Sequence, residues 1–472
     1  MTPPQDEEAS ARRRRTVVVP LIIGCAILMQ TLDTTMVATA LPSMARALSV
    51  SPLALNLVLT AYLLGAAVFM PISGWAADRF GARTVFLTAI AVFGLSSLAC
   101  GLSQNLDQVI GARLVQGCAG AMLIPVGRLV MLRTATKAEI VSATTVLTVP
   151  ALLGPVIGPP LSGFIVGAAS WRWVFLANAP VAIAGLVLVA RHIDNVREPD
   201  APRLDLVGAV LAALATAGLA IGLGSLGRSQ PSTGAALGLA SAGLALGWLY
   251  VFYARRRPGP VVDLSPFYDG TFRKVLLGGC FVRPIMGAVP YLLALLLQVA
   301  LGLSALAAGL LTLATALGAL SMRLVAGPLM RWAGFRRLLV VDGLLVAASL
   351  LACALIEPGT PRVAIFVLLA AHGIVRAIQV TSLNALAYAD LPPHQMSSGS
   401  TLMGLSQQLA QCLGIGLCSS LVHWSQQIRG GASLSSRDIA VGFVGVALVS
   451  LLAQPFFLAL GKDAGAELIG RR

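Results

Sequence analysis

Long apolar runs separated by short polar connections follow one another from end to end of the chain. About 20 apolar residues, rising ~1.5 Å each, form a helix long enough to cross the hydrocarbon core of a bilayer. The pattern therefore predicts an all-α integral membrane protein with about fourteen transmembrane helices. Their expected positions are 17–41, 52–75, 84–103, 106–129, 140–166, 173–192, 204–226, 233–254, 273–300, 304–327, 337–356, 362–386, 399–424 and 438–460.

The polar connections carry an uneven distribution of charge. The 472-residue chain is 57% hydrophobic and only 11% charged, with a net charge of +14, whereas soluble domains carry roughly 25% charged residues. With the N-terminus in the cytoplasm, most Lys and Arg residues fall in the tails and the cytoplasmic loops, as the positive-inside rule requires. We therefore expect both termini in the cytoplasm. The positive net charge is explained by this topology without a nucleic-acid partner.

A short repeated loop divides the chain into two related halves. GWAADRFGAR (Gly74–Arg83) follows the second predicted helix and GPLMRWAGFR (Gly327–Arg336) follows the tenth. Such internal repeats are typical of transporters built from two bundles, and the helices at 204–254 form an inserted pair between them. We expect a cytoplasmic tail over 1–16, a six-helix bundle over 17–192, two linking helices with cytoplasmic flanks within 193–272, a second six-helix bundle over 273–460 and a cytoplasmic tail over 461–472.

Asp33 is the only charged residue between Arg15 and Arg46. A charge at the centre of a membrane helix costs roughly 2.5–3.5 kcal/mol on insertion scales, so it normally marks a proton or substrate pathway. The alternative is an acid that pairs structurally with a neighbouring helix. Arg113 lies within the fourth predicted helix, with Gln116 one turn further on, and Asp33 is its nearest candidate partner; Arg113 could also serve only to fix the helix.

Polar residues within the later helices indicate a cavity. We assign Gln116, Arg283, Gln298 and Asn384 to a substrate cavity, in which Arg283 favours an anionic group. His372 and Arg376 also lie within predicted helices. Asp342 stands near a helix start, from which it could reach the cytoplasmic interface.

The fifth predicted helix combines small residues with prolines. Gly154, Gly158 and Ser162 recur every four residues, a spacing that permits close helix packing. Prolines remove backbone donors and bend helices. We predict a hinge formed by Gly154, Pro155, Gly158, Pro159 and Gly163.

The loop after the second helix has the composition of a conformational latch. Charged side chains there can bond to a neighbouring helix end in one state and release it in the other. We assign this role to Gly74, Asp78, Arg79, Gly81 and Arg83.

Several function classes find no support in the sequence. There is no GxxxxGK[ST] nucleotide loop, no CxxC pair among the seven cysteines, no metal-ligand cluster and no catalytic triad. We expect neither an enzyme nor a bound cofactor or metal. A non-transporting sensor would need a soluble domain, for which the tails and loops are too short.

Five motifs in order resemble the major facilitator superfamily and, more closely, its fourteen-span drug:proton antiporter family (EmrB/QacA type), in particular the MdtD-like branch. They are LDTTMVATALP (Leu32–Pro42), GWAADRFGAR, RLVQGCAGAMLIPVGRL (Arg113–Leu129), GPVIGPPLSGFIV followed by SWRWVFLANAP (Ser170–Pro180), and NALAYADLPP with SSGSTLMGLSQQL in the second half. The sequence departs from the pattern at Ala38, where Asn is usual, and at Ser162, where Gly is usual.

The resemblance implies two six-helix bundles plus two extra helices, and multidrug-type export by alternating access in a bacterial inner membrane. It implies that the proton gradient is the energy source, that Asp33 carries the proton, and that Arg113 couples to it. Export of a specific anionic metabolite or metal chelate remains an alternative. We expect a monomer in the lipid bilayer that binds a small-molecule substrate and protons; an outer-membrane efflux partner is left open.

Overall fold

Helices and short turns make up the computed structural model throughout the part of the chain that it describes, which contains no strand. The described residues are 14–134, 139–195, 204–225, 233–257, 259–392, 395–431, 433–461 and 463–469. The predicted all-α fold class is confirmed.

The first bundle is formed by residues up to His192. Its elements are η1 (Arg14–Val18), α2 (Val19–Ala47), η2 (Pro52–Leu55), α3 (Asn56–Phe69), η3 (Met70–Ile72), α4 (Ser73–Phe80), α5 (Ala82–Leu102), α6 (Leu106–Thr134), α7 (Ile140–Ala168), α8 (Arg172–Leu176) and α9 (Asn178–His192). The first predicted helix, 17–41, continues through Pro42 to Ala47, because a proline within a long packed helix need not end it.

The second bundle follows an intervening helix pair. That pair is α10 (Leu206–Gly224) and α11 (Thr233–Ala254). The bundle contains η4 (Ser265–Tyr268), α12 (Gly270–Val282), α13 (Pro284–Ala294), η5 (Leu295–Ala300), α14 (Ala305–Ala333), α15 (Phe335–Ala354), α16 (Arg362–Ala387), α17 (Met396–Arg429), α18 (Ser436–Leu451) and α19 (Gln454–Leu458), and η7 (Ala466–Ile469) closes the described chain.

Thirteen of the described helical segments are long and apolar enough to cross a membrane. The predicted span at 399–424 lies in α17, which has 34 residues but is too polar to be counted with the others. Its Ser and Gln side chains explain the difference, since a helix placed among other helices can carry polar groups that a lipid-facing helix cannot.

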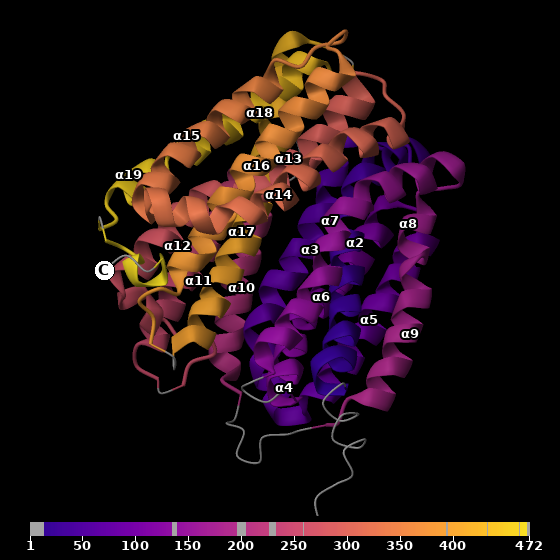
Figure 1. Cartoon of the computed structure of the whole chain (residues 1–472). Helices are drawn as coiled ribbons and strands as arrows, with labels where there is room; N and C mark the ends of the chain where they lie inside the picture. The colour runs from indigo at the N-terminus through magenta and orange to yellow at the C-terminus, as the bar shows by residue number, and fades with distance from the viewer. Residues whose placement is uncertain are drawn as a thin grey trace, which may run out of the picture.

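The two bundles meet mainly through the pairs α7–α14 and α3–α17 (Figure 1). α7 packs against α2 of its own bundle and against α14 of the other, while α3 packs against α17. The linking helix α10 contacts both α3 and α17, so the extra pair lies beside the seam between the bundles. We call the end of the first bundle that carries α4 the latch end, and the opposite end, with the turn between α2 and η2, the far end.

Contacts between the bundles are found at the far end. Gln298 Nε2 donates a hydrogen bond to the Thr39 carbonyl at 2.8 Å, and Tyr291 Oη bonds to the Leu53 carbonyl at 3.3 Å. Gly163 of α7 lies directly against the backbone of Ala305 at the start of α14, where a Cβ would collide. These contacts join the bundles at the far end in this conformation.

Candidate functional site

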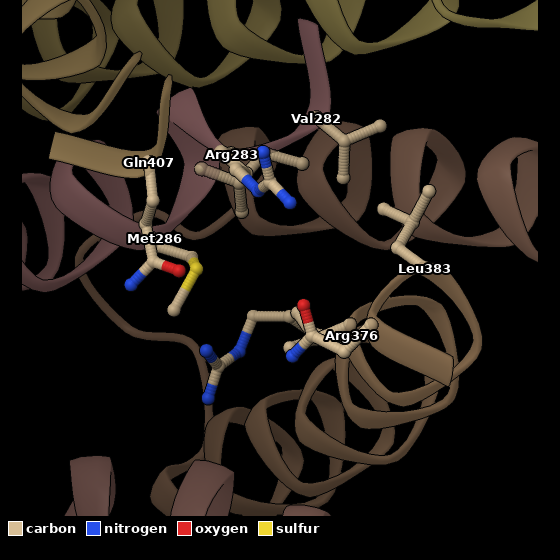
Figure 2. Close-up of a pocket in the computed structure, with 9 residues that line it drawn as sticks. Val282, Arg283, Met286, Arg376, Leu383 and Gln407 are labelled. Carbon is tan, nitrogen blue, oxygen red and sulfur yellow. The ribbon is translucent and has the colours of Figure 1, made fainter. Parts of the chain in front are cut away.

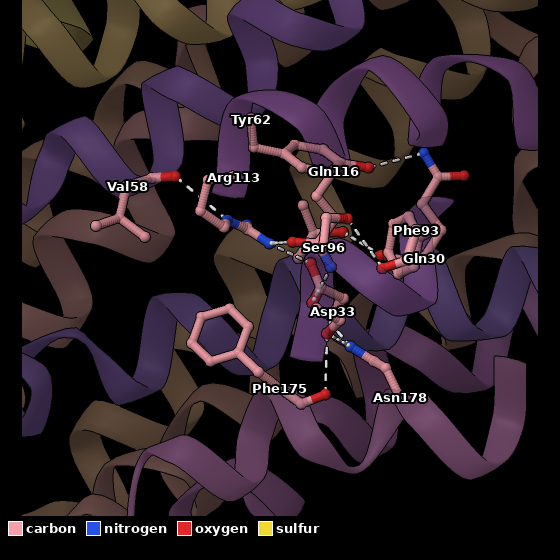
Figure 3. Close-up of polar contacts among 12 residues, drawn as sticks. Gln30, Asp33, Val58, Tyr62, Phe93, Ser96, Arg113, Gln116, Phe175 and Asn178 are labelled. Carbon is pink, nitrogen blue, oxygen red and sulfur yellow. Dashed lines mark hydrogen bonds and ion pairs between the residues drawn. The ribbon is translucent and has the colours of Figure 1, made fainter. Parts of the chain in front are cut away.

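Asp33 lies at the centre of a closed hydrogen-bond network in the first bundle (Figure 3). Arg113 of α6 donates from Nη1 to Asp33 Oδ2 at 2.5 Å. Gln116 donates from Nε2 to Asp33 Oδ1 at 3.0 Å and accepts from Arg113 Nη1 at 2.6 Å. All three side chains are 0% exposed. Because Arg113 and Gln116 are one helical turn apart, α6 presents both to the same carboxylate.

Asn178 adds a donor that the sequence analysis did not identify. Its Nδ2 donates to Asp33 Oδ1 at 2.9 Å and lies 3.0 Å from Ser97 Oγ. Asn178 begins α9, directly after the break that separates α9 from α8. The signal in the sequence was an Asn within the predicted sixth helix, but its partner there was not apparent.

Two aromatic rings enclose the charge pair. The Arg113 guanidinium carbon lies 4.7 Å from the centroid of the Tyr62 ring and 5.7 Å from that of Phe175. The half-buried Gln30, one turn before Asp33, donates to Tyr62 Oη at 3.0 Å. The Tyr62 and Phe175 rings can therefore stabilise the Arg113 cation through their faces.

The charge balance of this arrangement depends on whether Asp33 carries a proton. While Asp33 is ionised, it balances the Arg113 charge within a dry environment, where removal of either partner costs roughly 3–5 kcal/mol. A proton on Asp33 would neutralise the carboxylate and weaken its attraction for Arg113. The chemistry available here is proton binding, and no group of three or more His, Cys, Asp or Glu that could hold a metal occurs in the described ranges.

The second bundle contains a pocket with two arginines (Figure 2). Arg283 joins α12 to α13 and donates from Nη1 to Ser406 Oγ at 3.1 Å. Arg376 reaches the pocket from α16, and neither arginine forms an ion pair with another described residue. The lining residues are Val282, Arg283, Ile285, Met286, Arg376, Val380, Leu383, Asn384 and Gln407.

The four residues assigned to the substrate cavity are not together. Arg283 and Asn384 line the pocket of the second bundle. Gln116 lies in the Asp33 network, and Gln298 is bonded to Thr39 at the far end. Arg376 and Gln407 also line the pocket, although neither was among the residues predicted to line a substrate cavity.

The predicted hinge lies in one unbroken helix, α7. A Cβ at Gly154 would collide with the Thr31 hydroxyl, and one at Gly158 would collide with the Thr35 hydroxyl. Ser162 Oγ donates to the Met36 carbonyl at 2.6 Å. The small residues therefore bring α7 against α2 one turn from Asp33, with Pro155 and Pro159 in the same helix; hinge movement itself stays a prediction.

The segment predicted as a latch loop is largely helical: Gly74, Asp78 and Arg79 lie in α4, and Gly81 and Arg83 lie at its junction with α5. Asp78 Oδ1 accepts from Arg133 Nη2 of α6 at 2.7 Å, and Arg83 Nη2 donates to the Ala190 carbonyl at 2.5 Å. Gly81 has φ of +92° and packs on Asn195, which leaves no room for a side chain. Gly74 and Arg79 are exposed. The loop is thus tied to the ends of α6 and α9.

Comparison with known proteins identifies the family. The model of the Major Facilitator Superfamily matches residues 23–415. A protein of Salmonella typhimurium named "Putative multidrug resistance protein MdtD" is 36% identical over 455 residues, which covers 95% of this chain and 96% of the relative. Its namesake in Salmonella newport is also 36% identical, over 451 residues, with the same shares covered.

Solved structures share the fold at low sequence identity. The POT family transporter PepTSo matches with a TM-score of 0.70 at 13% identity, covering 96% of this chain and 98% of its own. An inward-facing, unoccupied bacterial homologue of the lysosomal transporter Spinster matches with a TM-score of 0.67 at 16% identity, covering 97% and 98%. With its family model, its relatives and its two helical bundles in agreement, this chain belongs to the major facilitator superfamily of membrane transporters.

Proposed function

We propose that this protein is a proton-coupled exporter of small molecules, of the multidrug type, that works by alternating access of its two bundles. The observation that carries the proposal is the fully buried Asp33–Arg113 ion pair, separated by 2.5 Å. An acid inside a membrane protein is a costly group whose usual role is proton or substrate movement. The name of the MdtD relatives supports the same class of transport.

The cycle begins with a proton from outside reaching Asp33. The neutral carboxyl releases Arg113, and the network rearranges across α2, α6 and α9. Since α2 packs against α7, and α7 against α14, a shift of α2 is transmitted to the contact between the bundles. Loss of the proton to the cytoplasm restores the pair, so an inward proton gradient drives substrate outwards. No cofactor takes part.

We infer an orientation with the latch end in the cytoplasm of a bacterial inner membrane. Arg79 lies in the last turn of α4, and Arg83, Arg336 and Arg337 lie at the starts of α5 and α15; the positive-inside rule predicts such a cluster on the cytoplasmic side. Both termini then lie in the cytoplasm, and the far end, where Gln298 bonds to Thr39, faces outwards. The protein acts as a monomer.

The decisive experiment replaces Asp33 with Asn in proteoliposomes that carry an imposed proton gradient. Asn preserves the shape of the side chain but cannot bind a proton, so proton-driven uptake into inverted proteoliposomes should fall to the protein-free level. Asp107→Asn changes an exposed acid at the start of α6 and should transport like the wild type. Substrate accumulation by the Asp33→Asn variant would refute the assignment.

A second candidate function is export of an anionic substrate. It is favoured by the Arg283 and Arg376 guanidiniums, which line one pocket without a described carboxylate partner. Guanidinium groups bind carboxylates and phosphates through charge-assisted hydrogen bonds. A pair of fluorescent dyes of similar size and opposite charge would distinguish the candidates, since Arg283→Ala should abolish export of the anion only.

A further inference from the structure

Asp342 is a second buried acid, and the proton mechanism described above does not use it. It lies in the third turn of α15 and is 2% exposed. Both of its carboxylate oxygens are buried and have no hydrogen-bond partner among the described residues. Asp33, in contrast, receives hydrogen bonds from Arg113, Gln116 and Asn178.

Polar side chains from two other helices reach the same turn of α15. The amide groups of Gln379 (α16) and Gln454 (α19) both approach the backbone of Gly343, where a Cβ would collide with the Gln454 amide. Gln454 Nε2 donates to the Val340 carbonyl at 3.2 Å. Gln379 Oε1 and Gln454 Oε1 are buried without described partners, like the Asp342 oxygens. The interface of α15, α16 and α19 therefore holds a cluster of unsatisfied acceptors.

No described cation compensates Asp342. On α16, which packs against it, His372 bonds to Ser349 of α15 two turns further along, and Arg376 lines the pocket. On α18, Asp438 pairs with Arg429, and Arg437 stands beside Asp438 at the far end of the bundle. α19 contains no charged residue, Arg331 in the last turn of α14 is exposed, and Arg336 and Arg337 lie at the start of α15.

We propose that Asp342 is a second proton-binding site, which is occupied in this conformation and gives up its proton during the transport cycle. A buried carboxylate without a counter-ion is far less stable than its neutral acid. Asp342 stands about 10 Å from the first residue of α15 at 1.5 Å per residue, so opening of the α15–α19 interface would bring water to it from the latch end. Asp342 then loses its proton to that water and remains as a carboxylate.

Proton binding can be tested without transport. Infrared difference spectra of the purified protein should show the carbonyl band of a protonated carboxylic acid at neutral pH, and that band should be lost in Asp342→Asn. The band should survive in Asp107→Asn, which removes an exposed acid. If the spectra of wild type and Asp342→Asn agree, Asp342 does not hold a proton and the proposal is wrong.

Thermal unfolding provides a second measurement with a defined sign. A group that is protonated in the fold and ionised in the unfolded chain stabilises the protein less as pH rises. The melting temperature of the wild type should fall as pH rises from about 4, the ordinary pKa of an unfolded Asp, into the neutral range, and Asp342→Asn should reduce that fall. The measurement is repeated in sodium-free buffer, because an effect that requires sodium would assign the acceptor cluster to a metal cation and overturn the proposal. Asp342→Ser replaces Asp342→Asn if the latter does not fold.

The role in transport rests on the proposed function and needs its own readout. The number of protons moved per substrate should decrease in Asp342→Asn while substrate is still exported. An unchanged ratio would overturn this part of the proposal. A failure of the Asp33 assignment would instead appear as active Asp33→Asn protein, so the two outcomes are distinguishable.

Discussion

The interiors of the two bundles treat charge in opposite ways. In the first bundle, Asp33 and Arg113 neutralise each other; Asp33 accepts further hydrogen bonds from Gln116 and Asn178, and the Arg113 guanidinium lies over two aromatic rings. In the second, Arg283, Arg376 and Asp342 have no described ion-pair partner. Protonation of the acid can break an ion pair that is balanced within the protein. An unpaired charged group instead needs a proton or a bound ligand to balance it.

This difference is the basis for expecting separate tasks in the two halves. The first bundle contains the buried Asp33–Arg113 pair, and α7 connects the helix that carries Asp33 to the second bundle. The second bundle contains a pocket lined by two guanidiniums without a described ion-pair partner. Substitutions should therefore reduce stability most in the first bundle and change selectivity most in the second.

The largest expected effect is that of Arg113→Ala. It leaves Asp33 buried without its counter-ion, which costs roughly 3–5 kcal/mol, so the protein should accumulate poorly in the membrane and melt at a lower temperature. The double variant Asp33→Asn/Arg113→Gln removes both charges and should recover most of the stability but not transport. Equal melting temperatures for the single and double variants would show that the two residues are not coupled.

Arg376→Gln, in contrast to Arg113→Ala, should leave stability intact and weaken the binding of an anionic substrate. No described ion pair is broken, so thermal stability should be unchanged or higher. If the substrate is an anion, its KM should rise about 10-fold or more, because a hydrogen bond to a charged group contributes roughly 1.5–3 kcal/mol. Arg362→Gln, an exposed change at the start of α16, serves as the control. A clear loss of stability in Arg376→Gln would contradict the comparison between the bundles.

Much of this arrangement could be predicted from the sequence, for a physical reason. Bilayer thickness fixes helix length, so apolar runs located the helices, and even the polar α17 was placed correctly as a long helix. Asp33 and Arg113 were predicted as partners because each is costly alone in a membrane. The loop motif and the Gly-Pro helix were likewise evident from local spacing.

The features that could not be predicted from the sequence depend on how the helices are rotated relative to one another. The spacing predicted that Gln116 lies on the same helix face as Arg113. It did not predict that Gln116 bonds to Arg113 and Asp33 and so lies away from the pocket. Gln298 appeared similar to Asn384, yet one binds Thr39 of the other bundle and the other lines the pocket. Asn178 and Tyr62 contact the charge pair only through tertiary packing, which no single helix specifies.

Tyr62 allows the aromatic cover of the charge pair to be divided into its two contributions. Tyr62→Phe removes the hydrogen bond from Gln30, worth roughly 0.5–1.5 kcal/mol, and keeps the ring over Arg113. Tyr62→Leu also removes the cation–π contact, which contributes up to about 2 kcal/mol when desolvated. Thermal unfolding should therefore rank wild type, Phe and Leu in that order. Equal losses in both variants would show that the ring itself contributes nothing.

The smallest effect on stability is expected at the latch. The Asp78–Arg133 pair is partly exposed, with side-chain exposures of 38% and 19%, and pairs of this kind contribute less than about 1 kcal/mol. Asp78→Asn should therefore melt close to the wild type, yet transport should slow, because the contact between α4 and the end of α6 would no longer favour one conformation. Arg133→Gln should slow transport equally, and the double variant no further, since both changes break one contact. Additive effects on the transport rate would mean that Asp78 and Arg133 act separately, and the latch would then have to be assigned to Arg83 and its bond to the end of α9.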